Sequence, residues 1–178
     1  KTAIPVHLVD YDASWPDMAG LYAGQLHVLG PTLIAVHHIG STAVPGLSGK
    51  PVIDLMPIVT SLEALDEKQA DMESVGFIWL GEFGVKGRRF CALNASDGRR
   101  IVQLHIYATG NPNARRQLAF RDYLRAFPDV AAAYEAEKRR ARELYPDDSH
   151  AYSAEKGAFI REVEAQALDW FVGEPDLI

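Results

Sequence analysis

The sequence has 178 residues, of which 48% are hydrophobic and 24% charged; this is typical of a globular protein and excludes a disordered chain. A formal net charge of −6 argues against a general basic surface, so we do not expect duplex nucleic acid as a partner. The one cysteine, Cys91, excludes an internal disulfide and a cysteine-based zinc module. No apolar run approaches the roughly 18 residues of a membrane helix, and no signal-peptide pattern begins the sequence. We therefore expect a cytoplasmic protein without a membrane segment.

The first half of the sequence predicts helices and strands that alternate around one polar loop. Gly30 and Pro31 end the first helical pattern, and the apolar runs on both sides of the loop predict strands buried on both faces. Thr60 and Glu63 form a capping-box pattern that predicts the start of a further helix. In chain order we expect a short strand at 6–9, a helix at about 15–29, strands at 33–39 and 51–59, and a helix at about 60–75.

The second half predicts short strands and then helices. Strands are expected at 77–80, 88–93 and 101–107, with a hairpin turn at 94–98, and helices starting near 111, 129 and 149. The later strands follow one another without helices between them, which favours an α+β fold. We expect a small, bent mixed sheet with flanking helices and a C-terminal set of helices. These would form a single domain over 1–178, with its core at about 5–110 and its helical part at about 111–172.

The loop between the two buried strands, His38–Asp54, is the strongest candidate for a binding site. Its glycines let backbone N–H groups approach an anion, and its hydroxyl and ammonium groups are donors that suit phosphate oxygens. The residues expected to hold phosphate here are Gly40, Ser41, Thr42 and Lys50. The loop is not a Walker A motif, because Val44 and Pro51 stand where that motif needs Gly and Ser or Thr. A simple turn rich in Gly and Pro is the alternative.

Asp54 and His105 are the candidates for catalysis and metal binding. A carboxylate in an apolar strand is costly without a cation, a metal ion or several N–H donors. His105 shares one face of its predicted strand with Gln103 and Tyr107, by the period of two. Asp54 and His105 would form an oxygen and nitrogen site better suited to Mn²⁺ or Zn²⁺ than to Mg²⁺. The alternatives are an ion pair of Asp54 with Lys50 or an arginine, and a histidine without chemistry.

Basic side chains outside the loop are further candidates for phosphate contacts. Arg88 begins a predicted strand and suits bidentate binding of phosphate. Arg121 and Arg125 lie one helical turn apart beside apolar positions, which favours an inward orientation. Lys138 and Lys156 each follow a tyrosine by four positions on successive helices, so that each pair shares a helix face. The alternative is a solvated helix face, which is what most such charges form.

These residues together resemble the GrpB-like family of the nucleotidyltransferase-like superfamily. The resemblance covers about residues 5–170, and its first motif is long and specific. Its matching segments are His38–Asp54, Glu82–Arg88, Leu104 with His105, Phe120–Arg125, Tyr134 with Lys138, and Tyr152 with Lys156. The resemblance implies a nucleotidyltransferase-like core, a pocket for a nucleotide or phosphate ester at the Gly-Ser-Thr loop, and a divalent metal such as Mg²⁺, Mn²⁺ or Zn²⁺. In some bacteria such a domain is fused to dephospho-coenzyme A kinase, which suggests a nucleotide-like ligand.

The carboxylate pattern departs from that of active nucleotidyltransferases. These usually carry two carboxylates two residues apart on one strand and a third on a later strand, to hold two metal ions about 4 Å apart. Here Met56 stands two positions after Asp54, and His105 takes the third place. An ordinary two-magnesium site is therefore not expected, and Glu82 is a further candidate ligand beside Asp54 and His105.

Three hypotheses follow from the sequence. The first is a nucleotidyl- or phosphoryl-transferring enzyme, in which Asp54 and His105 or Glu82 hold a metal. Its ligand-binding residues would be Gly40, Ser41, Thr42, Lys50, Arg88, Arg121, Lys138 and Lys156. The second is a non-catalytic nucleotide- or coenzyme-binding domain that regulates or accompanies an enzyme of a coenzyme A pathway. The third, which we rank well behind, is a structural module in which the loop is only a turn.

Overall fold

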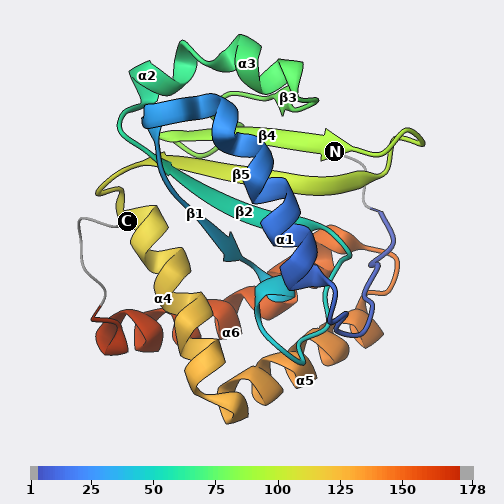
Figure 1. Ribbon diagram of the computed structural model, residues 1–178. Helices are drawn as coiled ribbons and strands as arrows, with labels where there is room; N and C mark the ends of the chain where they lie inside the picture. The colour runs from blue at the N-terminus through green and yellow to red at the C-terminus, as the bar shows by residue number, and fades with distance from the viewer. Residues whose placement is uncertain (1–3, 173–178) are drawn as a thin grey trace.

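A five-stranded mixed sheet forms the centre of the computed structural model, which describes residues 4–172 (Figure 1). The strands are β1 (Leu33–Ile39), β2 (Ile53–Val59), β3 (Ile78–Trp79), β4 (Arg88–Asn94) and β5 (Arg100–Ala108), and their order across the sheet is β1-β2-β5-β4-β3. The central pair β2 and β5 is parallel, and the other neighbours are antiparallel. The register pairs Asp54 with Gln103, so that two polar residues from β2 and β5 stand next to each other.

The helices cover both faces of the sheet and extend beyond one of its ends (Figure 1). They are α1 (Trp15–Gly24), the 3-10 segments η1 (Gln25–Thr32) and η2 (Ser41–Ala43), α2 (Leu62–Asp66), α3 (Gln69–Ser74), α4 (Pro112–Ala126), α5 (Pro128–Leu144) and α6 (Ser149–Trp170). Helix α1 crosses one face, and α4, α5 and α6 pack against one another below the sheet in the view of Figure 1. Within residues 4–172, none of these helices combines the length and apolar character needed to cross a membrane.

The alternation of side chains along β2 divides the core between the two faces of the sheet. Leu55 packs with Trp15 and Leu26 on the face covered by α1 and η1. Met56 packs on the opposite face with Leu118 of α4. Asp54 is two residues from Met56 and so belongs to the α4 face, but it lies at the end of the strand, where the core gives way to the polar loop. The strand therefore holds a carboxylate at the boundary between a packed core and an open site.

The structure confirms the α+β architecture and the three C-terminal helices, and it corrects the expected boundaries of the earlier ones. The first helical pattern is α1 followed by the 3-10 segment η1, within which Gly30, with a φ of 53°, departs from helical geometry. The predicted helix at 60–75 is two short helices, α2 and α3. Its N-cap is Ser61, whose hydroxyl accepts a 3.1 Å hydrogen bond from the N–H of Ala64. The expected strand at 6–9 is an isolated bridge between Val9 and Gly49.

Candidate functional site

The loop after β1 approaches Asp54 so closely that glycine is required at its start. Gly40 has a φ of 78°, and a methyl group added there would lie 2.9 Å from Oδ2 of Asp54. At the other end of the loop, a methyl group on Gly49 would lie 2.8 Å from Cβ of Ser41. Both glycines therefore serve close approach: the first brings backbone against the carboxylate, and the second folds the loop back on its own serine.

Helix α5 holds the loop through two side chains one turn apart. The Nζ of Lys138 donates hydrogen bonds to the Oγ of Ser41 at 2.5 Å and to the carbonyl oxygen of Ser48 at 2.6 Å. The carboxylate of Glu135 accepts from the N–H of Ser48 at 2.9 Å and from its hydroxyl at 2.8 Å. Lys138 is only 2% exposed, so its ammonium group is buried against the loop.

Two arginine side chains of helix α4 hold the same loop by donating hydrogen bonds to the loop's backbone carbonyls. Arg121 donates to the carbonyl oxygen of His38 at 3.1 Å, and Arg125 donates to that of Ala43 at 2.8 Å. The Nε2 of His38 lies 2.7 Å from the Oγ1 of Thr42. Burial, and next the positive charge of Arg125, lower the pKa of His38 to about 4, so this ring is neutral at pH 7. The sequence predicted phosphate contacts for Arg121, and in the structure this guanidinium group binds the loop backbone.

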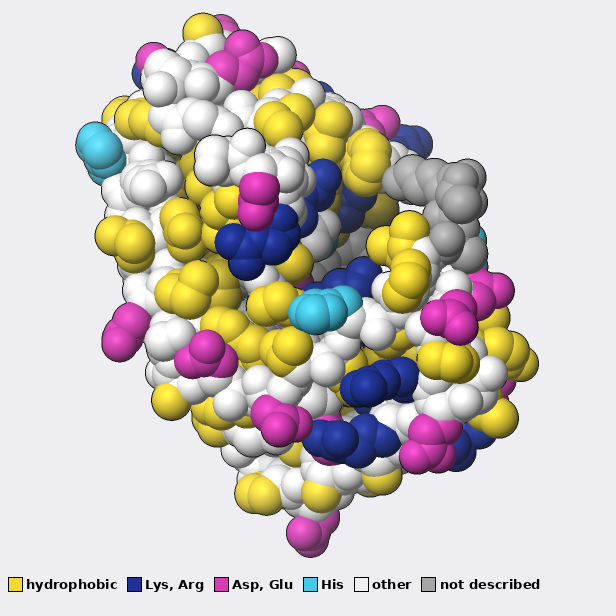
Figure 2. Space-filling view, turned by 90° about the vertical axis from the view of Figure 1, so that its right-hand side faces the viewer, with side chains coloured by type: hydrophobic (Ala, Val, Ile, Leu, Met, Phe, Trp, Pro, Cys, Tyr) yellow, Lys and Arg dark blue, Asp and Glu magenta, His cyan; other side chains and the backbone are white. Residues whose placement is uncertain are grey.

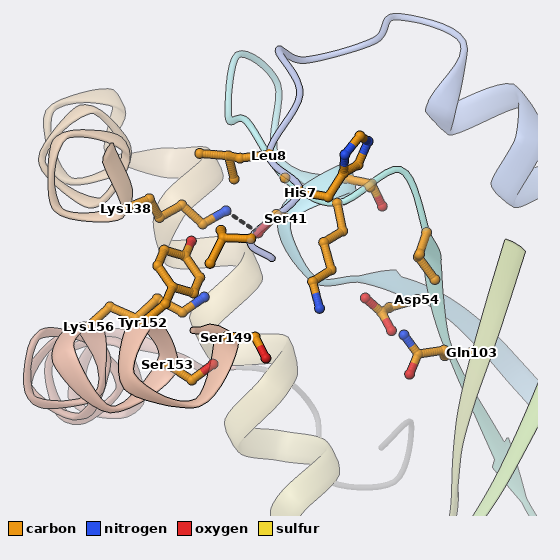
Figure 3. A pocket seen from close by; sticks show the side chains of 15 residues that line it. His7, Leu8, Ser41, Asp54, Gln103, Lys138, Ser149, Tyr152, Ser153 and Lys156 are labelled. Carbon is orange, nitrogen blue, oxygen red and sulfur yellow. Dashed lines mark hydrogen bonds between the residues drawn. The ribbon is translucent and has the colours of Figure 1, made fainter. Parts of the chain in front are cut away.

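A cavity of about 220 Å³ opens between the loop, the ends of β2 and β5, and helices α5 and α6 (Figure 3). Lys138 and Lys156 reach it from α5 and α6 on one side, while Asp54 and Gln103 face it from the sheet on the other. It is lined by Val6, His7, Leu8, Ser41, Thr42, Gly49, Lys50, Val52, Asp54, Gln103, Lys138, Ser149, Tyr152, Ser153 and Lys156. In the space-filling view this side of the molecule is hollowed, and Lys and Arg side chains gather in and around the hollow (Figure 2).

The amino-terminal segment closes one side of the cavity. The N–H and carbonyl of Val9 each form a 3.0 Å hydrogen bond with the backbone of Gly49. The N–H of Val6 donates to the carbonyl of Pro146 at 2.9 Å, and the N–H of Ser149 donates to the carbonyl of Ile4 at 3.0 Å. Backbone pairing therefore fixes residues 4–9 between the loop and the start of α6.

The lysines of the cavity carry positive charge that the protein only partly compensates. Burial, and next the charge of Lys156, lower the pKa of Lys138 to about 7. Burial, and next the charge of Lys50, lower the pKa of Lys156 to about 8. Both ammonium groups lie against aromatic rings, at 5.0 Å from the ring centre of Tyr134 for Lys138 and 4.5 Å from that of Tyr152 for Lys156. A negatively charged ligand would relieve the repulsion between these groups.

Asp54 is linked by hydrogen bonds to residues that lie behind the cavity. Its Oδ1 lies 2.9 Å from Nε2 of His105, and Nδ1 of His105 lies 3.3 Å from Nη1 of Arg88. Arg88 also donates to the carbonyl oxygens of Glu82 and Phe83, and the Glu82 carboxylate accepts from the N–H of Gly87 in the same turn. Within residues 4–172, no three His, Cys, Asp or Glu side chains gather in a group that could hold a metal ion.

The structure therefore brings six of the expected site residues together around the cavity: Ser41, Thr42, Lys50, Asp54, Lys138 and Lys156. Gly40 lies directly against Asp54, Arg121 lies behind the loop, and His105, Arg88 and Glu82 form a second layer behind Asp54. The sequence placed Gln103 on the strand face of His105 and Tyr152 one helical turn before Lys156, but neither of them nor His7 was predicted to line the site. Gln103 could have been found from the strand period it shares with His105, whereas nothing in the sequence connects His7 with the loop.

The fold places the chain in a structural class that is known from solved proteins. The chain superposes on the Cid1 poly(U) polymerase, solved with MgATP bound, with a TM-score of 0.53 at 11% identity, over 75% of this chain and 44% of that one. With its mixed sheet and the Gly-Ser loop after β1, the protein has a nucleotidyltransferase-like fold. The model of the GrpB protein family matches residues 5–166, and the chain belongs to that family. The crystal structure of GrpB from Enterococcus faecalis matches with a TM-score of 0.84 and 36% identity, over 92% of this chain and 98% of that one.

Curated relatives at this level of identity include longer proteins. The UPF0157 protein YqkA of Bacillus subtilis (strain 168) is 36% identical over 94% of this chain and 49% of its own length. The dephospho-CoA kinase of Mycolicibacterium paratuberculosis is 32% identical over 93% of this chain and 47% of its own length. The chain thus spans about half the length of these two relatives.

Proposed function

We propose that the cavity binds the phosphate groups of a nucleotide or of another phosphorylated small molecule. The observation that carries this proposal is the convergence of Lys50, Lys138 and Lys156 on the hydroxyls of Ser41 and Thr42 around one cavity. The whole chain has a net charge of −6, so this positive cluster is a local feature that opposes the overall charge. Ammonium and hydroxyl donors around a small concave site match the oxygens of phosphate.

The contacts of the lysines support an anionic ligand. The hydrogen-bond acceptors of Lys138 are the neutral Oγ of Ser41 and carbonyl of Ser48, and Glu135 contributes only through its negative field. Asp54 is the one carboxylate among the residues that line the cavity, against the three lysines. An incoming phosphate would therefore gain charge-assisted hydrogen bonds without displacing an existing lysine–carboxylate pair.

The size of the cavity favours a ligand that is bound by its phosphate end. At about 220 Å³ it is smaller than the roughly 300–1,000 Å³ of sites that enclose drug-sized molecules. A diphosphate or triphosphate group fits such a volume, and a nucleoside attached to it would extend toward the open side of the hollow. This is the reason to favour a nucleotide or coenzyme over inorganic phosphate alone.

Metal-dependent nucleotidyl transfer is the enzymatic form of this function. Mg²⁺ is usually held by one or two carboxylates together with phosphate oxygens and water. Asp54 fits the single carboxylate of such a site, since its Oδ2 lies at the loop, whereas His105 is engaged at both ring nitrogens. When bound, such an ion neutralises charge on the phosphate that is transferred. The chain's own residues would bind the phosphates with the three lysines and hold the loop with Glu135.

A non-catalytic binding domain is the second candidate, and Met56 favours it. This residue occupies the position where a second carboxylate would stand, and it is completely buried in the core with Leu118. The similarity to about half of a mycobacterial dephospho-CoA kinase would suit a domain that binds coenzyme A precursors beside an enzyme.

Calorimetric titration would test binding. We expect nucleoside triphosphates, dephospho-coenzyme A or pyrophosphate to bind, and adenosine not to bind. The variants Lys50→Met and Lys156→Met should weaken binding, whereas Lys86→Met, an exposed lysine outside the cavity, should not. Absence of binding by every phosphorylated compound would overturn the proposal.

A second assay separates the enzymatic form from the binding form. Incubation with nucleoside triphosphates labelled at the α-phosphate, with Mg²⁺ or Mn²⁺ and candidate acceptors, should transfer label if the protein is an enzyme. Asp54→Asn should then abolish transfer while metal-free pyrophosphate still binds. Binding without transfer under every metal would leave the non-catalytic domain as the function.

A further inference from the structure

A chain of hydrogen bonds leads from the cavity into the sheet and ends in a turn between β3 and β4. It runs from Asp54 to His105 at 2.9 Å and from His105 to Arg88 at 3.3 Å. It continues from Arg88 to the carbonyl of Phe83 at 2.9 Å and to that of Glu82 at 3.3 Å. The cavity is not lined by His105, Arg88 or Glu82, so these hydrogen bonds can affect the site only through Asp54.

The donors and acceptors along these hydrogen bonds determine which ring nitrogen of His105 carries the proton. A guanidinium group can only donate hydrogen bonds, so Nδ1 of His105 must accept from Arg88. The ring proton therefore lies on Nε2, which donates to Oδ1 of Asp54. A doubly protonated ring would set two donors against each other at Nδ1. The partner at one nitrogen thus determines the tautomer and the hydrogen bond at the other, as in other oriented histidines.

The turn that holds Arg88 has a strained backbone, and this strain supports a functional role for the arrangement. Phe83 has a φ of 48° and is the one non-glycine residue with positive φ in residues 4–172. A bulky residue adopts this backbone conformation rarely, and it persists where the surrounding structure requires it. The Phe83 ring stacks on Phe90 at 5.1 Å between ring centres, and Phe90 meets the His105 ring edge-on at 5.3 Å. The turn therefore fixes Arg88 directly by its carbonyls, and it supports the ring of His105 indirectly through Phe90 of β4.

We propose that His105 is a positioning residue for Asp54, held in its Nε2–H tautomer by Arg88, and is not itself a metal ligand. Oδ1 of Asp54 is then occupied by His105, and Oδ2, which lies against Gly40, is presented to what enters the cavity. The functional part of this inference rests on the phosphate-binding function proposed above. The hydrogen-bond chain does not depend on it.

The tautomer can be tested without any ligand. Long-range ¹H–¹⁵N spectra of the six histidines, with His105 identified from the His105→Gln variant, should show Nδ1 unprotonated and hydrogen-bonded and Nε2 protonated. Arg88→Met should shift the His105 Nδ1 signal. The matched control is Arg89→Met, because the guanidinium group of Arg89 donates to Asp66 at 2.8 Å and to the backbone carbonyl of Arg88 at 3.1 Å, not to His105. A wild-type ring protonated on Nδ1 would overturn the proposal, even if the Arg88 variant fails to fold.

The role toward Asp54 can be tested with MnATP as the probe in calorimetry. His105→Gln keeps an N–H donor for Asp54 and should bind MnATP like the wild type, whereas His105→Leu should bind about 10-fold more weakly, as is usual for residues that orient a ligand. Equal losses for both variants would identify His105 as a metal ligand and overturn the proposal. If the wild type does not bind MnATP, the proposed function fails in that form, and the spectra still decide the tautomer.

Discussion

The Nζ of Lys138 in α5 lies 2.5 Å from the Oγ of Ser41, 97 residues earlier in the loop after β1. This contact joins the C-terminal helices to the sheet at the point where the proposed ligand binds. It also explains how a lysine can be buried here, since the ammonium group has two oxygen acceptors on the loop. The C-terminal helices thus complete the site that the loop begins.

Ligand affinity should fall as the pH rises, because of the lysines. The pKa of Lys138 is lowered to about 7 and that of Lys156 to about 8. Below these values both groups are already charged when an anion binds. Above them, binding must take up protons, so affinity for pyrophosphate should decrease between about pH 6 and pH 9, the range around these values. Titration calorimetry in buffers of different ionisation enthalpy would measure the proton uptake, and its absence at about pH 8 would contradict the prediction.

The stability of the free protein should follow the opposite trend through the same groups. Between the lowered folded-state pKa values and the ordinary lysine pKa of 10.5, the unfolded chain binds more protons than the folded one. The contribution of Lys138 and Lys156 to the free energy of unfolding therefore rises with pH over this range. Denaturant titrations of the wild type and of Lys156→Met at several pH values would isolate it, since the variant should show a smaller rise.

Lys138→Met should weaken phosphate binding strongly while the protein remains folded. The substitution removes a charge that is costly to bury, but it leaves Ser41 and the Ser48 carbonyl without a donor, so these effects on stability oppose each other. A lost hydrogen bond to a charged group corresponds to about 1.5–3 kcal/mol in binding, or roughly 10-fold to 100-fold in Kd. Calorimetry and thermal denaturation would measure both effects. Lys68→Met, on the surface beside Asp71, is the control and should change neither.

Gly40→Ala should disrupt the site, whereas Gly46→Ala should affect only stability. Both glycines have positive φ, of 78° and 82°, so alanine at either position should cost about 1–3 kcal/mol of unfolding free energy. At Gly40 the added methyl group would also meet Asp54 at 2.9 Å, and at Gly46 it would meet nothing within 4 Å. Chemical denaturation and pyrophosphate titration would compare them. Equal binding by the two variants would show that the approach of Gly40 to Asp54 does not shape the site.

Glu135→Ala should loosen the loop from α5. Its carboxylate accepts two hydrogen bonds from Ser48, and a buried N–H left without an acceptor costs about 1–3 kcal/mol. Amide hydrogen exchange at Ser48 should therefore accelerate in this variant. Glu137→Ala provides the comparison, because the Glu137 carboxylate pairs with Arg140 rather than with Ser48 and its loss should leave that exchange unchanged.

Much of this site could be predicted from local patterns, and the remainder depends on contacts between distant segments. Glycines and hydroxyl side chains around a lysine are enough to predict an anion-binding loop from the sequence alone. A carboxylate residue in an otherwise apolar strand likewise predicts a functional position. The return of α5 to the loop has no local signal. The role of Arg88 was also hidden, since an arginine at a strand start suits phosphate equally well. In the structure its guanidinium group is instead held by the carbonyls of Glu82 and Phe83.

The backbone pairing of residues 4–9 with Gly49 and the start of α6 has a practical consequence for handling this protein. The wall that Val6 and Leu8 contribute to the cavity is held in place by a few main-chain hydrogen bonds. Deleting residues 4–9 would remove one wall of the cavity. Variants prepared for binding assays should therefore keep these residues and their pairing with Gly49 intact.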